Sequence, residues 1–200
     1  MAEALLMATK FQRHVMKWKN CELCSLCKTR KNVVLYKGKV PCDILFIGEA
    51  PGVSEDILGH PFEGPAGSLL QEWIDRARAY AEVPNLRIGF TNVIACIPVE
   101  EIEGERGSKS KAPPKASIKA CAPRLKEIIQ IAHPKTIVAV GKYADQSVKA
   151  GELTSIQEKI SIIHPAAVLR MEDPPMRRLT EKRVQVTLNS LFEKYFGVDS

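Results

Sequence analysis

Six cysteines mark the residues of this chain that could bind a metal. Cys21, Cys24 and Cys27 are separated from one another by two residues each, whereas Cys96 and Cys121 stand far along the chain. Two or three thiolates at the shorter spacing can hold one metal ion or one edge of a cluster. Together with the two distant thiolates they would staple the N-terminal segment onto the rest of the protein. Zinc and an iron–sulfur cluster both fit this spacing.

A set of acids around a glycine-rich loop could take part in acid–base chemistry. The sequence GEAPG at 48–52 follows the apolar run 44–47. Its glycines and proline favour a tight loop whose backbone can approach a ligand closely. Glu49 lies inside the loop, and Glu55 and Asp56 follow it. The loop has neither a P-loop lysine nor a GxGxxG pattern, which disfavours nucleotide phosphates. An ordinary connection between a strand and a helix is the alternative interpretation.

His164 could supply a further polar group. The apolar run 160–163 leads directly into His164 and a proline, which places the imidazole at the end of a strand. In a parallel sheet that end lies at the same edge as the glycine-rich loop, where ligands of open α/β sheets bind. A histidine in such a place is, on its own, more often structural. Leu169 and Arg170 follow and combine an apolar tip with a cation.

Four apolar runs alternate with amphipathic stretches and must position these residues. We predict strands near 44–47, 88–94, 136–140 and 160–163. We predict helices near 66–80, 116–132, 142–149 and 177–195. The alternation indicates an α/β fold, with a mostly parallel central sheet and helices on both faces.

Two flanking segments complete the expected organisation. A basic amphipathic helix over 3–19 could contact DNA or present a solvated face. Segment 98–115 has four acids, then a Gly/Ser/Lys stretch and two prolines, so we expect a mobile surface loop whose basic half could contact phosphates. Cys42 adjoins the first strand and is interpreted as a small buried hydrophobe. We expect one domain over residues 1–200, with segment 1–42 stapled onto it by the thiolates.

The composition favours a nucleic-acid partner. The chain of 200 residues carries a formal net charge of +6 and has a pI of about 9.0, although a basic protein without a polyanionic partner has the same balance. We find no secretory signal and no apolar run of about 18 residues, so we expect a cytoplasmic protein with no membrane partner. In that reducing compartment, cysteines favour a metal or a cluster over disulfides.

Together these motifs resemble one family, the iron–sulfur (family 4) uracil-DNA glycosylases. The resemblance rests on GEAPG with a following ED, on GHPFEGPAG, on TNV before Cys96, and on HP after a strand. It runs from about Cys21 to the last helix, and block 48–67 is its most specific part. It implies a single three-layer α/β/α domain. It also implies a DNA repair enzyme that flips uracil out of DNA and hydrolyses its N-glycosidic bond. We expect this enzyme to act as a monomer.

The resemblance implies roles for individual residues. Glu49 would hold the attacking water, and Phe62 would stack on the flipped uracil. Asn92 would read the Watson–Crick edge of the base, and His164 would hydrogen-bond uracil O2 as negative charge grows there. Glu55 would support the pocket. The other implied positions are Gly48 and Ala50 beside the base, Leu169 and Arg170 in the loop that wedges into the duplex, and Cys21, Cys24, Cys96 and Cys121 as ligands of a [4Fe–4S] cluster.

Two departures from the family pattern are present. The segment that begins at Cys96 reads CIPVEEIEGERGSKSKAPP, where the family pattern is CRPPxNR. In the family this segment bears on DNA contacts and substrate preference. In this chain it holds no histidine, the residue a covalently trapping relative uses, so we expect turnover. HPAA replaces HPS and loses a hydroxyl. The alternatives are a DNA-binding or accessory protein on the same fold, and a glycosylase for another modified base.

Overall fold

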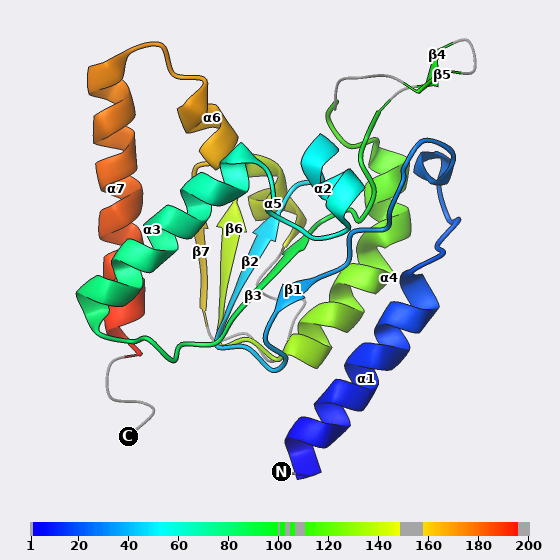
Figure 1. Ribbon diagram of the computed structural model, residues 1–200, viewed down its shortest axis with the longest axis horizontal. Coiled ribbons are helices and arrows are strands. Elements are labelled where there is room, and N and C mark those ends of the chain that lie inside the picture. Colours follow the sequence, from blue (N-terminus) through cyan, green and yellow to red (C-terminus); the bar gives the residue numbers. More distant parts are fainter. Residues whose placement is uncertain (1, 100, 103–104, 107–110, 149–157, 196–200) are drawn as a thin grey trace.

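A five-stranded sheet forms the centre of the computed structural model, which describes residues 2–99, 101–102, 105–106, 111–148 and 158–195 (Figure 1). The strand order is β1-β3-β2-β6-β7. Strands β3, β2, β6 and β7 are parallel to their neighbours, whereas β1 pairs antiparallel with β3. Their bounds are Lys37–Gly38 (β1), Ile44–Gly48 (β2), Ile88–Asn92 (β3), Thr136–Val140 (β6) and Glu158–Ile162 (β7). The predicted mostly parallel sheet is confirmed.

The central strands are buried on both faces, which explains their continuous apolar sequences. Every residue of β2, β3 and β6 is buried. The chain passes from β2 to β3 on one side and later returns to β6 on the other side of β2. Such a reversal opens a crevice outside the carboxyl ends of the strands, where ligands of open α/β sheets bind.

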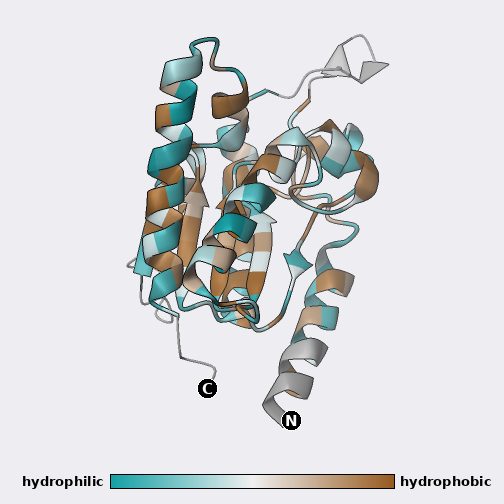
Figure 2. Ribbon diagram, turned by 60° about the vertical axis from the view of Figure 1, so that its left-hand side comes forward, coloured by the Kyte–Doolittle hydropathy of each residue, from teal (hydrophilic) through white to brown (hydrophobic). Residues whose placement is uncertain are grey.

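Helices cover both faces of the sheet and complete the three expected layers (Figure 1). Their bounds are Ala2–Trp18 (α1), Val53–Leu58 (α2), Pro65–Ala81 (α3), Lys115–Ala132 (α4), Lys142–Ser147 (α5), Pro165–Leu169 (α6) and Pro174–Glu193 (α7). Helices α3 and α7 pack together on one face, and α1 packs on α4 at the other. Figure 2 shows the apolar strands between these two helical layers.

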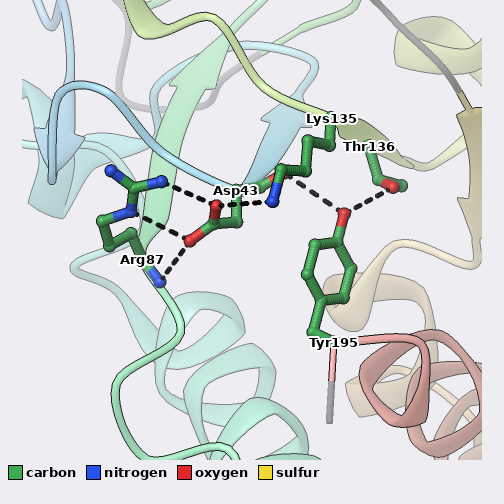
Figure 3. Close-up of polar contacts among 5 residues, drawn as sticks. All are labelled: Asp43, Arg87, Lys135, Thr136 and Tyr195. Atoms are coloured by element: carbon green, nitrogen blue, oxygen red, sulfur yellow. Dashed lines mark hydrogen bonds and ion pairs between the residues drawn. The ribbon is translucent and has the colours of Figure 1, made fainter. Parts of the chain in front are cut away.

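A polar cluster ties the strands together at their amino ends (Figure 3). Arg87, before β3, donates from Nε and Nη2 to the carboxylate of Asp43, before β2, at 3.0 and 2.8 Å, and Lys135 Nζ lies 3.6 Å from it. Tyr195 Oη hydrogen-bonds with Thr136 Oγ1 at 2.8 Å. Burial alone would raise the pKa of Asp43, but the hydrogen bonds and charge of Arg87 outweigh it and hold that pKa below its usual value. These contacts therefore join the segments before β2, β3 and β6 to the end of α7.

Several expected elements differ in detail. Strand β3 ends at Asn92, two residues earlier than predicted, and beyond it Val93 and Ile94 donate to the carbonyls of Gly48 and Glu49. The first helix is amphipathic, but Met16, one of its apolar residues, is 65% exposed and lies outside its buried face. The short helix α2 was not predicted, since its six residues are fewer than a recognisable amphipathic period needs.

The segment expected to be a mobile loop lies partly outside the described residues. Within it, β4 (Glu101–Ile102) pairs antiparallel with β5 (Glu105–Arg106). Residues 100, 103–104 and 107–110 are not described, so mobility stays a prediction. In the described part of the chain, no helix combines the length and apolarity needed to cross a bilayer.

Candidate active site at the carboxyl edge of the sheet

A cleft of about 640 Å³ opens at the carboxyl ends of the strands. Its walls come from the loop after β2, the start of α3, the end of β3 and helix α6. Most of the residues predicted to contact the base or wedge into DNA line it: Glu49, Ala50, Glu55, Phe62, Asn92, His164, Leu169 and Arg170. Gly48, the remaining predicted residue, is buried beneath it. Segments far apart in the sequence thus meet in one cavity.

Gly48 explains how Asn92 and Phe62 approach each other. It pairs with Asn92 across the parallel strands β2 and β3. A Cβ atom at Gly48 would stand 2.8 Å from Phe62 Cζ and closer still to Asn92 Oδ1. Any side chain there would displace both residues. Glycine therefore lets an amide and an aromatic ring share the floor of the cleft.

Phe62 is held in an unusual backbone conformation. Its φ is 58°, in the left-handed region that non-glycine residues rarely adopt. Glu55 braces the following residues, because its Oε1 accepts from the N–H groups of Glu63 at 3.1 Å and Gly64 at 2.9 Å. A side chain at Gly67 would collide with the backbone of Phe62. The ring itself lies 5.7 Å from that of Phe90.

Glu55 also reaches the other side of its loop. Its Oε2 accepts from the N–H of Gly52 at 3.0 Å, so one carboxylate joins the start of α2 to the loop that carries Phe62. With both oxygens engaged by backbone donors, Glu55 acts on the cleft by shaping its wall. The role of Glu55 in supporting a bound base stays a prediction.

His164 lies between β7 and α6 and caps that helix. Its Nδ1 accepts a hydrogen bond from the N–H of Ala166 at 3.1 Å. Gly141, with a φ of 91°, makes room for it, because a Cβ there would stand 3.0 Å from His164 Cβ. Burial lowers the pKa of His164, as does the charge of Arg170, while Glu55 opposes both. The ring is therefore neutral near pH 7 and carries its proton on Nε2.

Glu49 is the carboxylate at the end of β2 that lines the cleft. Its backbone is held by the N–H of Ile94, which donates to the Glu49 carbonyl at 3.2 Å. The side chain is half-buried, and burial raises its pKa above the ordinary value for glutamate. A carboxylate whose charge is poorly solvated is a good base and a good ligand for a water molecule.

Leu169 and Arg170, the two residues predicted to wedge into DNA, lie at the rim of the cleft. Leu169 is the last residue of α6 and is 37% exposed, and Arg170 is the C-cap of that helix. Both therefore lie at a helix end rather than inside a loop.

Lys111 is a residue at the cleft that the sequence analysis did not predict. It lines the cleft, and its N–H donates to the carbonyl of Pro98 at 2.8 Å. We expected that the basic half of segment 98–115 could contact phosphates, but nothing in the sequence placed Lys111 at the cleft.

Four cysteine side chains gather on the α1–α4 side of the sheet. Cys21 and Cys24 follow α1, Cys96 lies just beyond β3, and Cys121 is in α4. Burial raises the pKa of the Cys96 thiol to about 12, Arg30 opposes this, and the charges of the other three thiols would raise it further. Arg30 Nη1 lies 3.8 Å from Cys96 Sγ. The thiols are thus mutual neighbours, and none forms a disulfide.

The arrangement of these thiols is compatible with a cluster. Among the described residues, no three His, Cys, Asp or Glu side chains converge closely enough to hold one metal ion. A single zinc ion needs all its sulfurs within bonding distance of one point, whereas in a four-iron cluster each thiolate binds a separate iron. Four free thiols that interact electrostatically with one another, with Arg30 and Arg124 beside them, are suited to ligation as thiolates.

The other two cysteines have different surroundings. Cys42 is 1% exposed and lies against Tyr36 in the core, where burial raises the pKa of its thiol to about 12. The interpretation of Cys42 as a buried hydrophobe is consistent with this position. Cys27 is half-buried, and its N–H donates to the Cys24 carbonyl at 3.2 Å in the short 3₁₀ turn Ser25–Lys28.

Arg124 is a buried residue of α4 that sequence reasoning missed. It is 1% exposed, and its Nη1 donates to Thr91 Oγ1 at 3.0 Å. Its Nη2 donates to the carbonyl oxygens of Asn92 and Val93, the latter at 3.1 Å. Burial lowers the pKa of the guanidinium, and the nearby Cys121 thiol opposes this. The only available signal was the spacing of three from Cys121, which puts both side chains on one helix face.

Comparisons with known proteins identify the family and the fold of this chain. The model of the uracil DNA glycosylase superfamily matches residues 36–189. The chain is 34% identical to the Type-4 uracil-DNA glycosylase of Pyrobaculum aerophilum, over 76% of this chain and 81% of that protein. It is 28% identical to the Type-4 uracil-DNA glycosylase of Saccharolobus solfataricus, over 91% and 87% of the two. The crystal structure of Pedobacter heparinus SMUG2 is similar in fold, with a TM-score of 0.58, 13% identity, and coverage of 75% and 76%.

Proposed function

This chain belongs to the uracil DNA glycosylase superfamily, and from that premise we propose that it removes uracil from DNA by hydrolysing the N-glycosidic bond. The observation that carries the proposal is the convergence of four groups on one cleft. These are the Glu49 carboxylate, the Phe62 ring, the Asn92 amide and the His164 imidazole. Each supplies a different requirement of that reaction, and together they favour an enzyme over a DNA-binding protein without catalysis.

Phe62 and Asn92, at the floor of the cleft, recognise the base. A target base must leave the duplex stack before it can be cleaved, at a cost of a few kcal/mol. The half-buried Phe62 ring offers a face on which the flipped base can stack. Asn92 is 3% exposed, and its amide can donate to uracil O4 and accept from N3–H. Because Gly48 leaves room for both groups and Glu55 braces the loop that carries Phe62, recognition is pre-organised.

Bond cleavage falls to His164 and Glu49. As the glycosidic bond breaks, electrons move onto uracil and negative charge collects at O2. The neutral His164 ring, with Nδ1 occupied by the Ala166 N–H, can donate its Nε2–H to that oxygen. The sugar becomes positive at C1′, where the Glu49 carboxylate can stabilise charge and orient the attacking water. Water adds to C1′, and the products are an abasic site and free uracil.

Contact with the DNA duplex falls to the rim. The exposed Leu169 can fill the space left by the flipped nucleotide, and Arg170 beside it can contact phosphate. The formal net charge of +6 adds a general attraction to the polyanion. Uracil-containing DNA is therefore the proposed partner.

A uracil-containing oligonucleotide tests the proposed reaction directly. The protein is incubated with a duplex that carries one uracil, and the products are treated with alkali and run on a gel. We expect strand breakage at the uracil position and none in the matched thymine duplex. Binding to the uracil duplex without breakage would instead support the accessory-protein alternative. Breakage at another damaged base, but not at uracil, would support the third possibility.

We further propose that Cys21, Cys24, Cys96 and Cys121 hold a [4Fe–4S] cluster. Two observations support this: the thiols are close neighbours in space, and two cationic side chains face them. The ligands belong to the N-terminal segment, to the segment that follows β3, and to α4. The cluster would therefore act as a staple that holds segment 1–42 onto the sheet, near the strand that ends in Asn92.

Iron analysis of cysteine variants tests the cluster. The purified protein should be brown and contain iron and sulfide in equal amounts. Cys121→Ala should lose iron and stability, because one ligand of the staple is removed. Cys42→Ala is the matched control: Cys42 is similarly buried, yet its replacement should leave iron unchanged. A colourless protein that carries zinc would contradict the proposal.

A further inference from the structure

Arg124 connects the cysteine group to the strand end that carries Asn92. From α4, its guanidinium reaches the side chain of Thr91 and the carbonyl oxygens of Asn92 and Val93. These acceptors cover the last two residues of β3 and the first residue beyond it. On its other side, the same guanidinium faces the Cys121 thiol. One side chain therefore touches both the candidate base-reading segment and the candidate cluster ligands.

The burial of Arg124 requires a source of negative charge. Removing a cation from water costs several kcal/mol unless a counter-charge and hydrogen bonds offset it. The hydrogen-bond acceptors of Nη1 and Nη2 are the Thr91 hydroxyl and the carbonyls of Asn92 and Val93, all of them uncharged. Arg124 Nε has no hydrogen-bond partner within the described structure. The carboxylate one turn further along, Glu127, is engaged by Lys17 Nζ at 2.9 Å and by Trp18 Nε1 at 2.7 Å.

The cysteines can supply that charge when they bind iron. The thiols of Cys121, Cys96 and Cys21 all interact electrostatically with Arg124. Metal ligands are thiolates, and a four-iron cluster with four thiolates keeps a net negative charge in both common redox states. The buried Arg124 guanidinium then lies beside the negatively charged cluster, which compensates its charge. The neighbouring His14 adds no positive charge at pH 7, because burial first, and Arg124 as well, hold its pKa at about 4.

We propose that Arg124 is a positioning residue that compensates the charge of the loaded cysteine group and thereby holds the carbonyls of Asn92 and Val93 in the base-reading geometry. The proposal presupposes the cluster and the base-reading role of Asn92 proposed above. It assigns two separable duties to one side chain. Its charge compensates the cluster. Its rigid planar guanidinium holds the strand end, because its donors are spread in fixed directions toward separate acceptors, whereas an ammonium is a compact point charge.

The charge duty is tested by the reduction potential of the cluster. A nearby cation stabilises the more negative reduced form, so Arg124→Met should shift the midpoint potential to more negative values. The potential is measured by redox titration of the iron-loaded protein, followed by electron paramagnetic resonance. Arg78→Met is the matched control, since Arg78 donates to the Leu86 carbonyl at 2.7 Å on the opposite face of the sheet. Arg78→Met should lower the stability of the protein but leave the midpoint potential of the cluster unchanged.

The fork duty is tested by Arg124→Lys. An ammonium keeps the charge near the thiols but cannot serve Thr91, Asn92 and Val93 together. We expect a potential and an iron content close to those of the unmodified protein. The KM for uracil DNA should rise about tenfold, the equivalent of one lost hydrogen bond to a charged group.

The outcomes distinguish this proposal from the proposals it presupposes. An unmodified protein without iron overturns the cluster and this inference together. Iron-loaded Arg124→Met with an unshifted potential overturns the charge duty alone. Arg124→Lys with an unchanged KM overturns the fork duty. If Arg124→Met takes up no iron, Arg124→Gln replaces it: loss of iron in both neutral variants with retention in Arg124→Lys supports charge compensation, and equal loss in all three contradicts it.

Discussion

The Nδ1 atom of His164 accepts a hydrogen bond from the backbone N–H of Ala166 at 3.1 Å, so this side chain caps helix α6 and faces the cleft at the same time. The bond fixes the tautomer, because a neutral imidazole that accepts at Nδ1 carries its proton on Nε2. Capping and catalysis are therefore linked in one residue, and they can be separated by substitution.

His164→Ala should lower the single-turnover rate on uracil DNA by about 10²–10³, the size found for loss of one oxyanion donor. Affinity for the substrate should change little, because O2 carries less charge in the ground state. The same variant should lose about 1 kcal/mol of unfolding free energy with the helix cap. His164→Asn is the control, since asparagine restores the cap but is too short to place a donor at Nε2. A normal rate in His164→Asn would contradict the assigned role.

Glu49→Gln should slow cleavage while raising stability at neutral pH. The folded protein holds the pKa of Glu49 above its ordinary value, so the ionised form is less favourable in the folded chain than in the unfolded one. The destabilisation is present at pH 7 and disappears as the pH falls through the folded pKa, where the carboxyl takes up a proton. Urea unfolding of both proteins at pH 7 and at about pH 4 measures the difference, which should shrink on acidification.

The pH dependence of catalysis follows from the same group. The rate on uracil DNA should fall on the acid side with an apparent pKa above that of ordinary glutamate, because only the carboxylate can orient water. The slower Glu49→Gln variant should lose this limb. A retained acid limb in the variant would assign it to another residue, and His164, whose pKa is lowered, would be examined next.

Glu55→Gln should weaken binding of uracil DNA and lower stability by about 1–3 kcal/mol, the range for hydrogen bonds to a charged group. An amide has one acceptor oxygen, so it cannot serve the N–H groups of Gly52, Glu63 and Gly64 together. Glu63→Gln is the control, because that neighbouring side chain forms a surface ion pair with Lys37 at 2.8 Å, and exposed ion pairs contribute little to stability. Equal effects in the two variants, measured by denaturation and KM, would rule out the brace.

Leu169→Ala should slow cleavage of duplex substrate more than cleavage of the same single strand. A wedge is needed only where a paired, stacked base must be replaced. Leu6→Ala is the control, since Leu6 is also exposed, at 51%, but lies on α1 away from the cleft. Single-turnover rates on both substrates give the ratio. An unchanged ratio in Leu169→Ala would remove Leu169 from the wedge.

The parallel sheet could be predicted because its strands are buried on both faces. Runs such as 44–47 and 136–140 are apolar without alternation, and glycine or proline ends each of them. Glu49 and His164 follow two of these runs, which places them at one edge as soon as the strands are parallel. These conclusions depend only on local sequence and on the short connections of α/β proteins.

Contacts between distant segments could not be predicted from local sequence. The φ of 58° at Phe62 depends on Glu55 and on the absence of a side chain at Gly67. The burial of Arg124 depends on carbonyl groups more than 30 residues away, and an isolated arginine in an amphipathic helix is otherwise expected in solvent.

The sequence by itself therefore determined the alternation of the four parallel strands with their main helices, the residue types at the sheet edge and the number of thiols. The tertiary structure decided which of these residues share a cavity, which proton His164 carries and which charge lies beneath Asn92. The physical reason is the distance along the sequence over which each interaction acts. Apolar periodicity and turn chemistry act between residues near in sequence, whereas burial, hydrogen-bond partners and pKa depend on atoms that only folding brings together.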